Sequence, residues 1–329
     1  MAVKQLCRLG AKQEELKGGV MKVFLSGGTG FVGSEVRRQL LAAGHVVRVL
    51  VRDGSEGKLD DAVNQEVHLG DLTDASSLVG ALDGCEAVIH LVGIIREFPG
   101  RGVTFKRLHV KTTENLLLAA TEQGVKRFLH MSANGVRAQA NTGYHRTKWQ
   151  AEGLVRNSGL DWTIFRPSLI FGPGSEFVDM LAELIRRLPV VPVFGNGQYR
   201  MQPVAVEQVA ASFVKALKMP ETIGATYHQG GGSSYSYDEI LDLTAQALGK
   251  QKAVKIHQPL FMIKPLIKVM QSSEHFPITS DQLTMLVEGN VCEPGEWADA
   301  FDLQPMSYAE GIVNSLRQPA TPTQSSRSR

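Results

Sequence analysis

The sequence is poor in the features that mark secreted, nucleic-acid-binding and membrane-spanning proteins. Its three cysteines, Cys7, Cys85 and Cys292, lie far apart and form no CxxC pair. This excludes a disulfide framework and a zinc knuckle, and we expect a reducing compartment, the cytoplasm. The 35 basic and 33 acidic residues leave a net charge of +2, which gives no electrostatic basis for binding nucleic acid. No apolar run approaches the roughly 20 residues of a membrane-spanning helix.

Both ends of the chain lack the apolar pattern of a packed segment. Residues 1–20 have no continuous apolar core, so they do not form a secretory signal, and two acids without a serine disfavour a transit peptide. We expect a disordered or non-native leader there, because Met21 stands directly before the first strand. Residues 317–329 read RQPATPTQSSRSR, a composition that predicts a disordered tail.

Between the ends, short apolar runs alternate with segments of helical period. This alternation predicts βαβ crossovers and a parallel sheet covered on both faces. We expect residues 21–172 to form this doubly wound domain, and residues 173–316 a smaller mixed α/β lobe with segments returning to the first sheet. The expected strands are 22–26, 45–51, 66–69, 86–92, 126–132, 161–168 and 225–232, and the expected helices are 31–43, 73–82, 104–123, 143–157, 177–187, 206–217 and 236–248.

A glycine-rich turn, SGGTGFVG, joins the first strand to the first helix and fits both GxGxxG and GxxGxxG. Glycines at these positions permit a tight turn, a close backbone approach to a pyrophosphate and close packing of the helix on the strand. The N-terminus of the helix also attracts phosphates. The turn therefore predicts a Rossmann-type domain that binds a nicotinamide dinucleotide through Gly27, Gly28, Thr29, Gly30, Phe31, Val32 and Gly33.

The end of the second strand indicates which dinucleotide is bound. Val51 stands where NAD-binding folds place an acid for the ribose 2′-hydroxyl, and Arg52 follows it. A guanidinium suits a 2′-phosphate, and Lys58 could assist it. This favours NADP(H), whereas NAD(H) stays open if Asp53 binds the hydroxyl instead.

Two further strand ends are candidates for contacts with the dinucleotide. Asp71 and Leu72 follow the third strand, where a carboxylate could meet the adenine amino group. Leu91, Val92 and Gly93 follow the fourth strand, where backbone and small side chains would line the cofactor.

A YxxxK pair opens the helix after the fifth strand. Tyr144 and Lys148 are four residues apart and therefore share one helix face. A nearby ammonium favours the phenolate, so we expect a lowered pKa for Tyr144 and a role in exchanging a proton while a nicotinamide exchanges a hydride. The alternative is a half-exposed tyrosine beside a solvated lysine.

Two other features have competing interpretations. His90, His109, His130 and His145 lack the spacing of metal ligands, and we expect no metal site. Residues 259–270 read PLFMIKPLIKVM, which favours a helix pair in the core of the smaller lobe. The same pattern also fits an amphipathic face for a lipid, a quinone-like substrate or a membrane partner.

These motifs resemble the short-chain dehydrogenase/reductase superfamily in its extended or atypical form, the NAD-dependent epimerase/dehydratase type. The matching segments are GGTGFVG, GDLTD, HLVG, YHRTK, RPSLIFGPG and PVAVEQVA, which span most of residues 21–250. Within it, PITSDQLTMLVEGNV and FDLQPMSYAEGI look like the C-terminal segments of the nucleotide-binding accessory subunit of respiratory complex I and its bacterial relatives.

The resemblance implies roles for residues that match the motifs. Tyr144 would be the acid/base, Lys148 would bind the nicotinamide ribose, Ser132 would complete the catalytic set, and Arg166 would lie beside the cofactor cleft. Two functions stay open: an oxidoreductase or epimerase acting on an apolar or quinone-like small molecule, and a non-catalytic accessory or assembly factor of a respiratory complex. The second implies a location at the periphery of the inner membrane.

Overall fold

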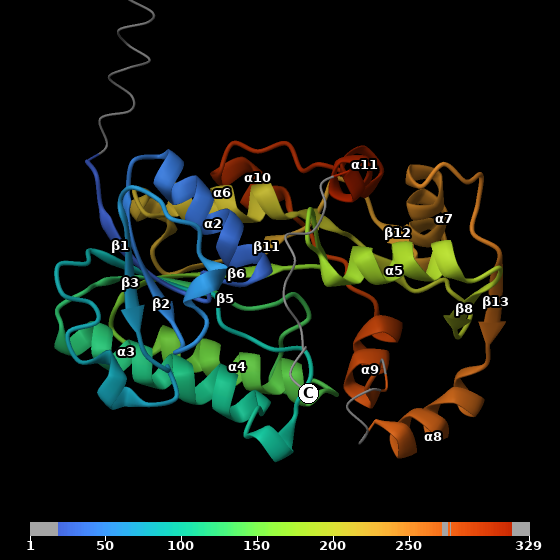
Figure 1. The fold of residues 1–329 in the computed structure, drawn as a ribbon, viewed down its shortest axis with the longest axis horizontal. Helices are drawn as coiled ribbons and strands as arrows, with labels where there is room; N and C mark the ends of the chain where they lie inside the picture. The colour runs from blue at the N-terminus through green and yellow to red at the C-terminus, as the bar shows by residue number, and fades with distance from the viewer. Residues whose placement is uncertain (1–18, 272–275, 277, 318–329) are drawn as a thin grey trace, which may run out of the picture.

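The computed structural model describes residues 19–271, 276 and 278–317 (Figure 1). The expected leader lies outside these residues except for Gly19 and Val20, and the expected tail lies outside them except for Arg317. Arg317 is the last residue of a helix, α11 (Tyr308–Arg317), so the packed chain extends one residue further than the sequence predicts.

The centre of the protein is a seven-stranded parallel sheet with the order β11-β6-β5-β4-β1-β2-β3. The predicted doubly wound sheet is confirmed, and strands expected from the apolar runs lie within a few residues of the observed ones. The last of these seven strands along the chain, β11, pairs with β6, and Tyr227 lies opposite Phe165. The strands are β1 (Lys22–Ser26), β2 (Val46–Val51), β3 (Gln65–Leu69), β4 (Ala87–His90), β5 (Arg127–Met131), β6 (Asp161–Pro167) and β11 (Ala225–Gln229).

Helices cover both faces of the sheet, and a separate apolar core fills each interface (Figure 1). On one face, Leu40 and Phe213 pack with Trp297 in one core, whereas on the other face Leu116 packs near Val155. The first layer consists of α2 (Phe31–Ala42), α6 (Val206–Ala216) and α10 (Gly295–Ala300), and the second of α3 (Thr112–Glu122) and α4 (Gly143–Arg156).

The smaller lobe has its own core, in which Leu181, Ile240 and Tyr308 are buried. Its main elements are α5 (Glu176–Arg187), β8 (Val191–Phe194), α7 (Tyr237–Ala247), β13 (Lys255–Gln258) and α11. Four short strands form two pairs. The strand β7 (Ile170–Phe171) pairs with β10 (Val204–Ala205), and β9 (Arg200–Met201) pairs with β12 (Tyr235–Ser236). Two further helices follow β13, α8 (Leu260–Met270) and α9 (Ser280–Glu288). The short helical segments elsewhere in the described chain are η1 (Glu56–Lys58), η2 (Ala75–Leu78), η3 (Pro99–Arg101), η4 (Lys106–Lys111) and η5 (Pro220–Thr222).

A buried arginine fastens the returning chain to the sheet. The Arg127 guanidinium donates hydrogen bonds to Asp161 O at 2.8 Å and to Thr163 Oγ1 at 2.9 Å, both on β6. It also donates to Ala216 O at 2.7 Å and to Thr222 Oγ1 at 2.8 Å, on the connection that leads into β11. Burial lowers the pKa of Arg127 to about 10, and four acceptors compensate for its lost hydration.

Two predicted helices differ from the structure. The helix expected over 73–82 is only the short 3₁₀-helix η2, because Asp74 accepts the Ser76 N–H and Gly80 then adopts a φ of +69°. Residues 259–270 do not form a helix pair in a core. Residues 260–270 form the single helix α8, in which only Ile267 is buried, and the periodicity could not show that the described residues leave most of this helix exposed.

Within the part of the chain that the structure describes, no helix is both long and apolar enough to span a bilayer.

Candidate dinucleotide and catalytic site

The glycine-rich turn lies at the carboxyl edge of the sheet between β1 and β4. Gly27 has a φ of +81°, and a Cβ at this residue would lie 3.2 Å from both Leu91 C and Val92 N. A Cβ at Gly33 would lie 2.0 Å from Gly27 O, so only glycine lets α2 begin directly against the turn. This edge is the switch point of the strand order, where doubly wound folds bind ligands.

The predicted residues of this turn lie together in the structure. Gly27, Gly28, Thr29 and Gly30 form the turn, and Phe31, Val32 and Gly33 open α2. Gly30 is the N-cap, no side chain caps the helix, and its first turn has no acid. The partial positive charge of the helix N-terminus is therefore available to a phosphate. The residues fit a dinucleotide here, since side chains at Gly27 and Gly33 would fill the cradle.

Val51 and Arg52, at the end of β2, differ in their exposure to solvent. Val51 is buried in the core, whereas Arg52, Asp53 and Lys58 are exposed. Among the described residues, the Arg52 guanidinium has no hydrogen-bond or ion-pair partner. Arg52 is therefore a cation that a 2′-phosphate could reach without displacing a partner.

At the end of β3, the Asp71 carboxylate already has a hydrogen-bond partner and the Leu72 side chain is buried. Asp71 Oδ1 accepts a hydrogen bond from the Thr73 N–H at 2.8 Å, so this carboxylate stabilises its own turn. Leu72 is buried in the core beneath α3, and its carbonyl accepts a hydrogen bond from Asn115 at 2.7 Å. Leu72 can therefore line a cofactor site only through its backbone.

Helix α4 carries three titratable side chains on one face: Tyr144, Lys148 and Glu152, spaced by four residues. Its N-terminus is fixed twice, because Thr142 Oγ1 accepts the His145 N–H at 3.3 Å and Asp281 accepts the Gly143 N–H at 2.8 Å. Asp281 belongs to α9, so the smaller lobe holds the start of the helix that carries Tyr144.

The Lys148 ammonium lies between the carboxyl ends of β4 and β5. Its Nζ donates a hydrogen bond to Met131 O at 2.9 Å, and a Cβ added to Gly93 would lie 3.0 Å from it. Burial lowers the pKa of Lys148 to about 8, against the opposing attraction of Glu152. The structure thus brings Lys148 next to the backbone that lines the glycine cradle.

Tyr144 lies among aromatic rings rather than beside the lysine charge. Its ring centroid is 5.9 Å from that of Phe105, 5.4 Å from that of His109 and 5.2 Å from that of His145. Burial raises the pKa of Tyr144 to about 12. The expectation that Lys148 lowers this pKa is therefore wrong for this arrangement, because desolvation dominates and Lys148 donates to Met131 instead.

His109 is a site residue that the sequence did not identify as one. It lies in η4, a π-helical segment, and its Nδ1 is 2.9 Å from Thr147 Oγ1 on α4. Its ring stacks on Phe105, and burial lowers its pKa to about 2, so the imidazole is neutral. π-Helical turns occur often at functional sites, but no spacing rule in the sequence announces one.

Arg166 binds a buried carboxylate, that of Glu152, whereas the buried Ser132 hydroxyl has no hydrogen-bond partner among the described residues. Arg166 donates two hydrogen bonds to the Glu152 carboxylate, of 2.8 and 2.6 Å. Burial alone would raise the pKa of Glu152, but the guanidiniums of Arg166 and Arg156 outweigh burial and hold this pKa below its ordinary value. Arg166, which the resemblance places beside the cofactor cleft, therefore pairs with Glu152 in the structure.

Two more histidines are buried behind Lys148. His90 Nδ1 is 2.7 Å from Ser26 Oγ, and its Nε2 is 3.1 Å from Thr113 Oγ1. The His130 ring lies 5.4 Å from that of His90, and among the described residues neither of its nitrogens has a hydrogen-bond partner. Burial lowers the pKa of both rings, which leaves them neutral. In the described part of the chain, no group of three or more His, Cys, Asp or Glu residues could hold a metal ion.

The contact at Gly33 predicts a large loss from a small substitution. Gly33→Ala should lower the free energy of unfolding by about 3 kcal/mol or more, because the added methyl meets a backbone oxygen that cannot move independently. Urea denaturation followed by circular dichroism measures this. Gly153→Ala is the matched control: a Cβ there meets nothing within 4 Å, and helix propensity should make it neutral or stabilising by up to about 1 kcal/mol. Equal stability of both variants would contradict the steric argument.

The lowered pKa of Lys148 predicts a pH dependence of stability. An unfolded lysine titrates near 10.5, so between about pH 8 and 10 the unfolded chain binds more protons at this residue than the folded protein does. The cost of burying the cation is full below pH 8 and falls as the pH rises. The unfolding free energy of the parent should therefore rise by a few kcal/mol relative to Lys148→Met. Lys111→Met, at an exposed ion pair, is the control; a parallel course for parent and Lys148→Met would count against it.

Comparison with known proteins agrees with the fold and the glycine turn. The sequence pattern of the NAD dependent epimerase/dehydratase family matches residues 23–229. The NADH dehydrogenase (ubiquinone) 1 alpha subcomplex subunit 9 of Arabidopsis thaliana mitochondria is 28% identical over 287 residues, which are 84% of this chain and 70% of that protein. The ceramide reductase of Caulobacter vibrioides is 29% identical over 238 residues, 72% of this chain and 74% of that protein.

A solved structure shows the same fold. The epimerase Mth375 from Methanothermobacter thermautotrophicus superimposes with a TM-score of 0.74 at 19% identity, and the match covers 91% of each chain. The family pattern extends over well over half of the present sequence and includes both the glycine turn and the YxxxK pair. The chain belongs to the NAD dependent epimerase/dehydratase family.

Proposed function

We propose that the protein is an NADP(H)-dependent oxidoreductase, with Tyr144 as its acid/base and Lys148 as the residue that binds the nicotinamide ribose. One observation carries the proposal. Tyr144 and Lys148 share a face of α4, and the Lys148 ammonium lies against Gly93, next to the backbone that meets the glycine turn. A dinucleotide held by the glycine turn would extend toward these two side chains.

The protonation state of Tyr144 favours one direction of the chemistry. A phenol with a pKa of about 12 stays protonated at neutral pH, so Tyr144 is suited to donate its proton to a carbonyl oxygen. The bound dinucleotide would supply the hydride. His109, neutral and stacked on Phe105, fixes the ring of Tyr144 from the side. Carbonyl reduction is therefore the reaction that these side chains support best.

The preference for NADP(H) rests on Val51 and Arg52. The buried Val51 removes the carboxylate that would repel a 2′-phosphate, and the Arg52 guanidinium is exposed at the end of β2. A guanidinium binds phosphate through two parallel hydrogen bonds, which a ribose hydroxyl cannot match.

The substrate we propose is an apolar carbonyl compound. Tyr144 is flanked by the rings of Phe105, His109 and His145, which would favour an apolar or quinone-like molecule over a sugar. One relative is a ceramide reductase, a name that also points to a lipid-like substrate.

A second candidate function is an accessory or assembly role in a respiratory complex at the inner membrane, with the dinucleotide as a structural ligand. The relative from Arabidopsis thaliana favours it, because it is a subunit of a mitochondrial NADH dehydrogenase. The pairing of Arg166 with Glu152 is also compatible with a site that holds a nucleotide without turnover.

Arg52→Ala tests the dinucleotide preference. NADPH binding should weaken by roughly 1.5–3 kcal/mol, the scale of a lost charge-assisted hydrogen bond, while NADH binding should barely change. Isothermal titration calorimetry with both dinucleotides measures this, and Arg187→Ala, at an exposed ion pair of α5, is the control. Equal losses for both dinucleotides, or tighter NADH binding by the parent, would refute the preference.

Tyr144→Phe separates the two candidate functions. The substitution removes one oxygen, so the fold and NADPH affinity should persist, while carbonyl reduction should fall by roughly 10²–10⁴-fold. Lys148→Met should lower both turnover and NADPH affinity. Tyr235→Phe, in the smaller lobe on β12, is the matched control. A reductase activity that survives Tyr144→Phe would remove the acid/base role, and silence of this variant in every assay while Arg52→Ala releases the nucleotide would favour the accessory role.

A further inference from the structure

Helix α8 exposes several large apolar side chains to solvent. The exposed fraction is 78% for Phe261, 76% for Val269 and 61% for Met262, and Leu266 and Met270 are also exposed. Ile267 is the one residue of the helix that is buried, at 1% exposure. Large exposed apolar surfaces on folded proteins commonly mark interaction sites.

The charged side chains of α8 itself, Lys264 and Lys268, have one sign. Residues 250–271 contain five lysines and no acid. At about 100° per residue, the apolar side chains of Phe261, Met262, Leu266 and Val269 lie on one arc of α8, and Lys268 and Lys264 follow next to Phe261 on one side of it. Both lysines are exposed. The helix therefore presents an apolar arc that is bordered by lysines on one side. Ile267 lies outside this arc and is buried.

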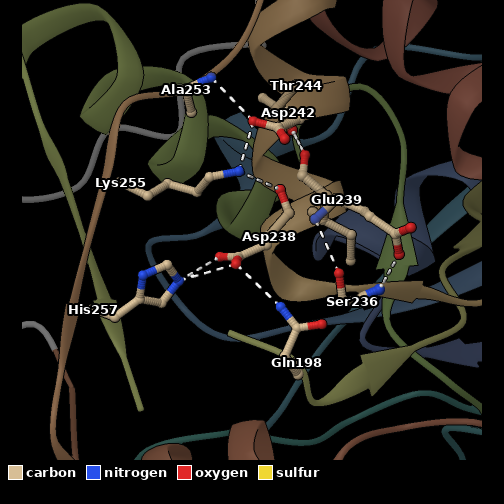
Figure 2. A network of polar contacts seen from close by, with 10 residues as sticks. Gln198, Ser236, Asp238, Glu239, Asp242, Thr244, Ala253, Lys255 and His257 are labelled. Carbon is tan, nitrogen blue, oxygen red and sulfur yellow. Dashed lines mark hydrogen bonds and ion pairs between the residues drawn. The ribbon is translucent and has the colours of Figure 1, made fainter. Parts of the chain in front are cut away.

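The strand that precedes α8 is attached to the smaller lobe by polar contacts (Figure 2). Strand β13 leads into the helix, and its Lys255 pairs with Asp242 at 2.7 Å while its His257 pairs with Asp238 at 2.9 Å. Both acids belong to α7. The backbone of β13 also pairs in parallel with β8.

The far end of the helix is attached as well. The Gln271 side chain, which follows α8, accepts the Ser280 N–H at the start of α9 at 2.9 Å. These contacts join the segments on both sides of α8 to the rest of the protein. The apolar arc of α8 is therefore a built surface, outside the dinucleotide site.

We propose that α8 docks the protein on an anionic lipid surface. Phe261, Met262, Leu266 and Val269 enter the boundary between headgroups and acyl chains, while Lys264 and Lys268 extend to the lipid phosphates. The two exposed lysines of α8, a helix that contains no acid, match a negative surface. A protein partner fits less well, because the cores of protein interfaces are poor in lysine, and a second copy of α8 would bring the same positive charges together.

Flotation of the full chain with lipid vesicles tests the docking. The parent should float with phosphatidylcholine vesicles containing phosphatidylglycerol, and binding should weaken strongly in pure phosphatidylcholine. The triple variant Phe261→Ser, Leu266→Ser, Val269→Ser should lower the partition coefficient by roughly 100-fold, and each of Lys264→Gln and Lys268→Gln by about fivefold. The matched control places serine at Val63, Val79 and Leu118, three other exposed apolar residues.

A fluorescence measurement locates the contact. In the variant Met262→Trp, emission should shift to the blue on adding anionic vesicles, and brominated acyl chains should quench it. Val79→Trp should show neither change. Both readouts work without turnover, so they are independent of the redox function proposed above, and dinucleotide affinity shows that the variants are folded.

Three results would overturn the proposal. The first is equal flotation of the parent and the triple serine variant. The second is equal binding to neutral and anionic vesicles. The third is a dimer of the parent that the triple variant converts to a monomer while the parent fails to float, which would make a second copy the occupant of this surface.

Discussion

The buried carboxylate of Glu152 is the constraint on which the arrangement of the site depends. It joins α4 to β6 through two hydrogen bonds with Arg166, and Arg156 adds a second positive charge from the same helix. Because Tyr144, Lys148 and Glu152 share one helix face, this ion pair sets the rotation of α4 about its axis. A buried pair is costly to break from one side, since the remaining charge is left uncompensated. The Trp149 ring lies under both guanidiniums and shields the pair.

The same region keeps Lys148 as the dominant charge of the candidate site. His90, His109 and His130 surround it, and burial holds the pKa of each far below its ordinary value, so they add no competing positive charge. Glu152 opposes the effect of burial on Lys148. Neutral imidazoles can accept or donate hydrogen bonds to the groups around them without repelling the ammonium. The site therefore combines one cation with a nearly apolar surrounding.

The sequence was a good guide where local chemistry decides the structure. The apolar runs located the strands, and the glycine spacing located the turn, because a Cβ at Gly33 has no room against Gly27. It was a poor guide where tertiary contacts decide. The π-helical turn that places His109, the raised pKa of Tyr144 and the pairing of Arg166 with Glu152 all depend on side chains distant in sequence. The exposure of α8 has a similar cause, since periodicity shows an apolar face but not what covers it.

The position of β11 has a consequence for the order in which the chain can fold during synthesis. The sheet ends on a strand from the second half of the chain, and the Arg127 guanidinium finds its partner Thr222 only 95 residues later. A nascent chain that stops near residue 172 would have β6 as an open edge and a buried arginine lacking two of its acceptors. Unpaired strand edges recruit other chains. The two lobes are therefore not separable modules: the sheet of the first becomes complete only after β11, which lies within the second half of the chain, has left the ribosome.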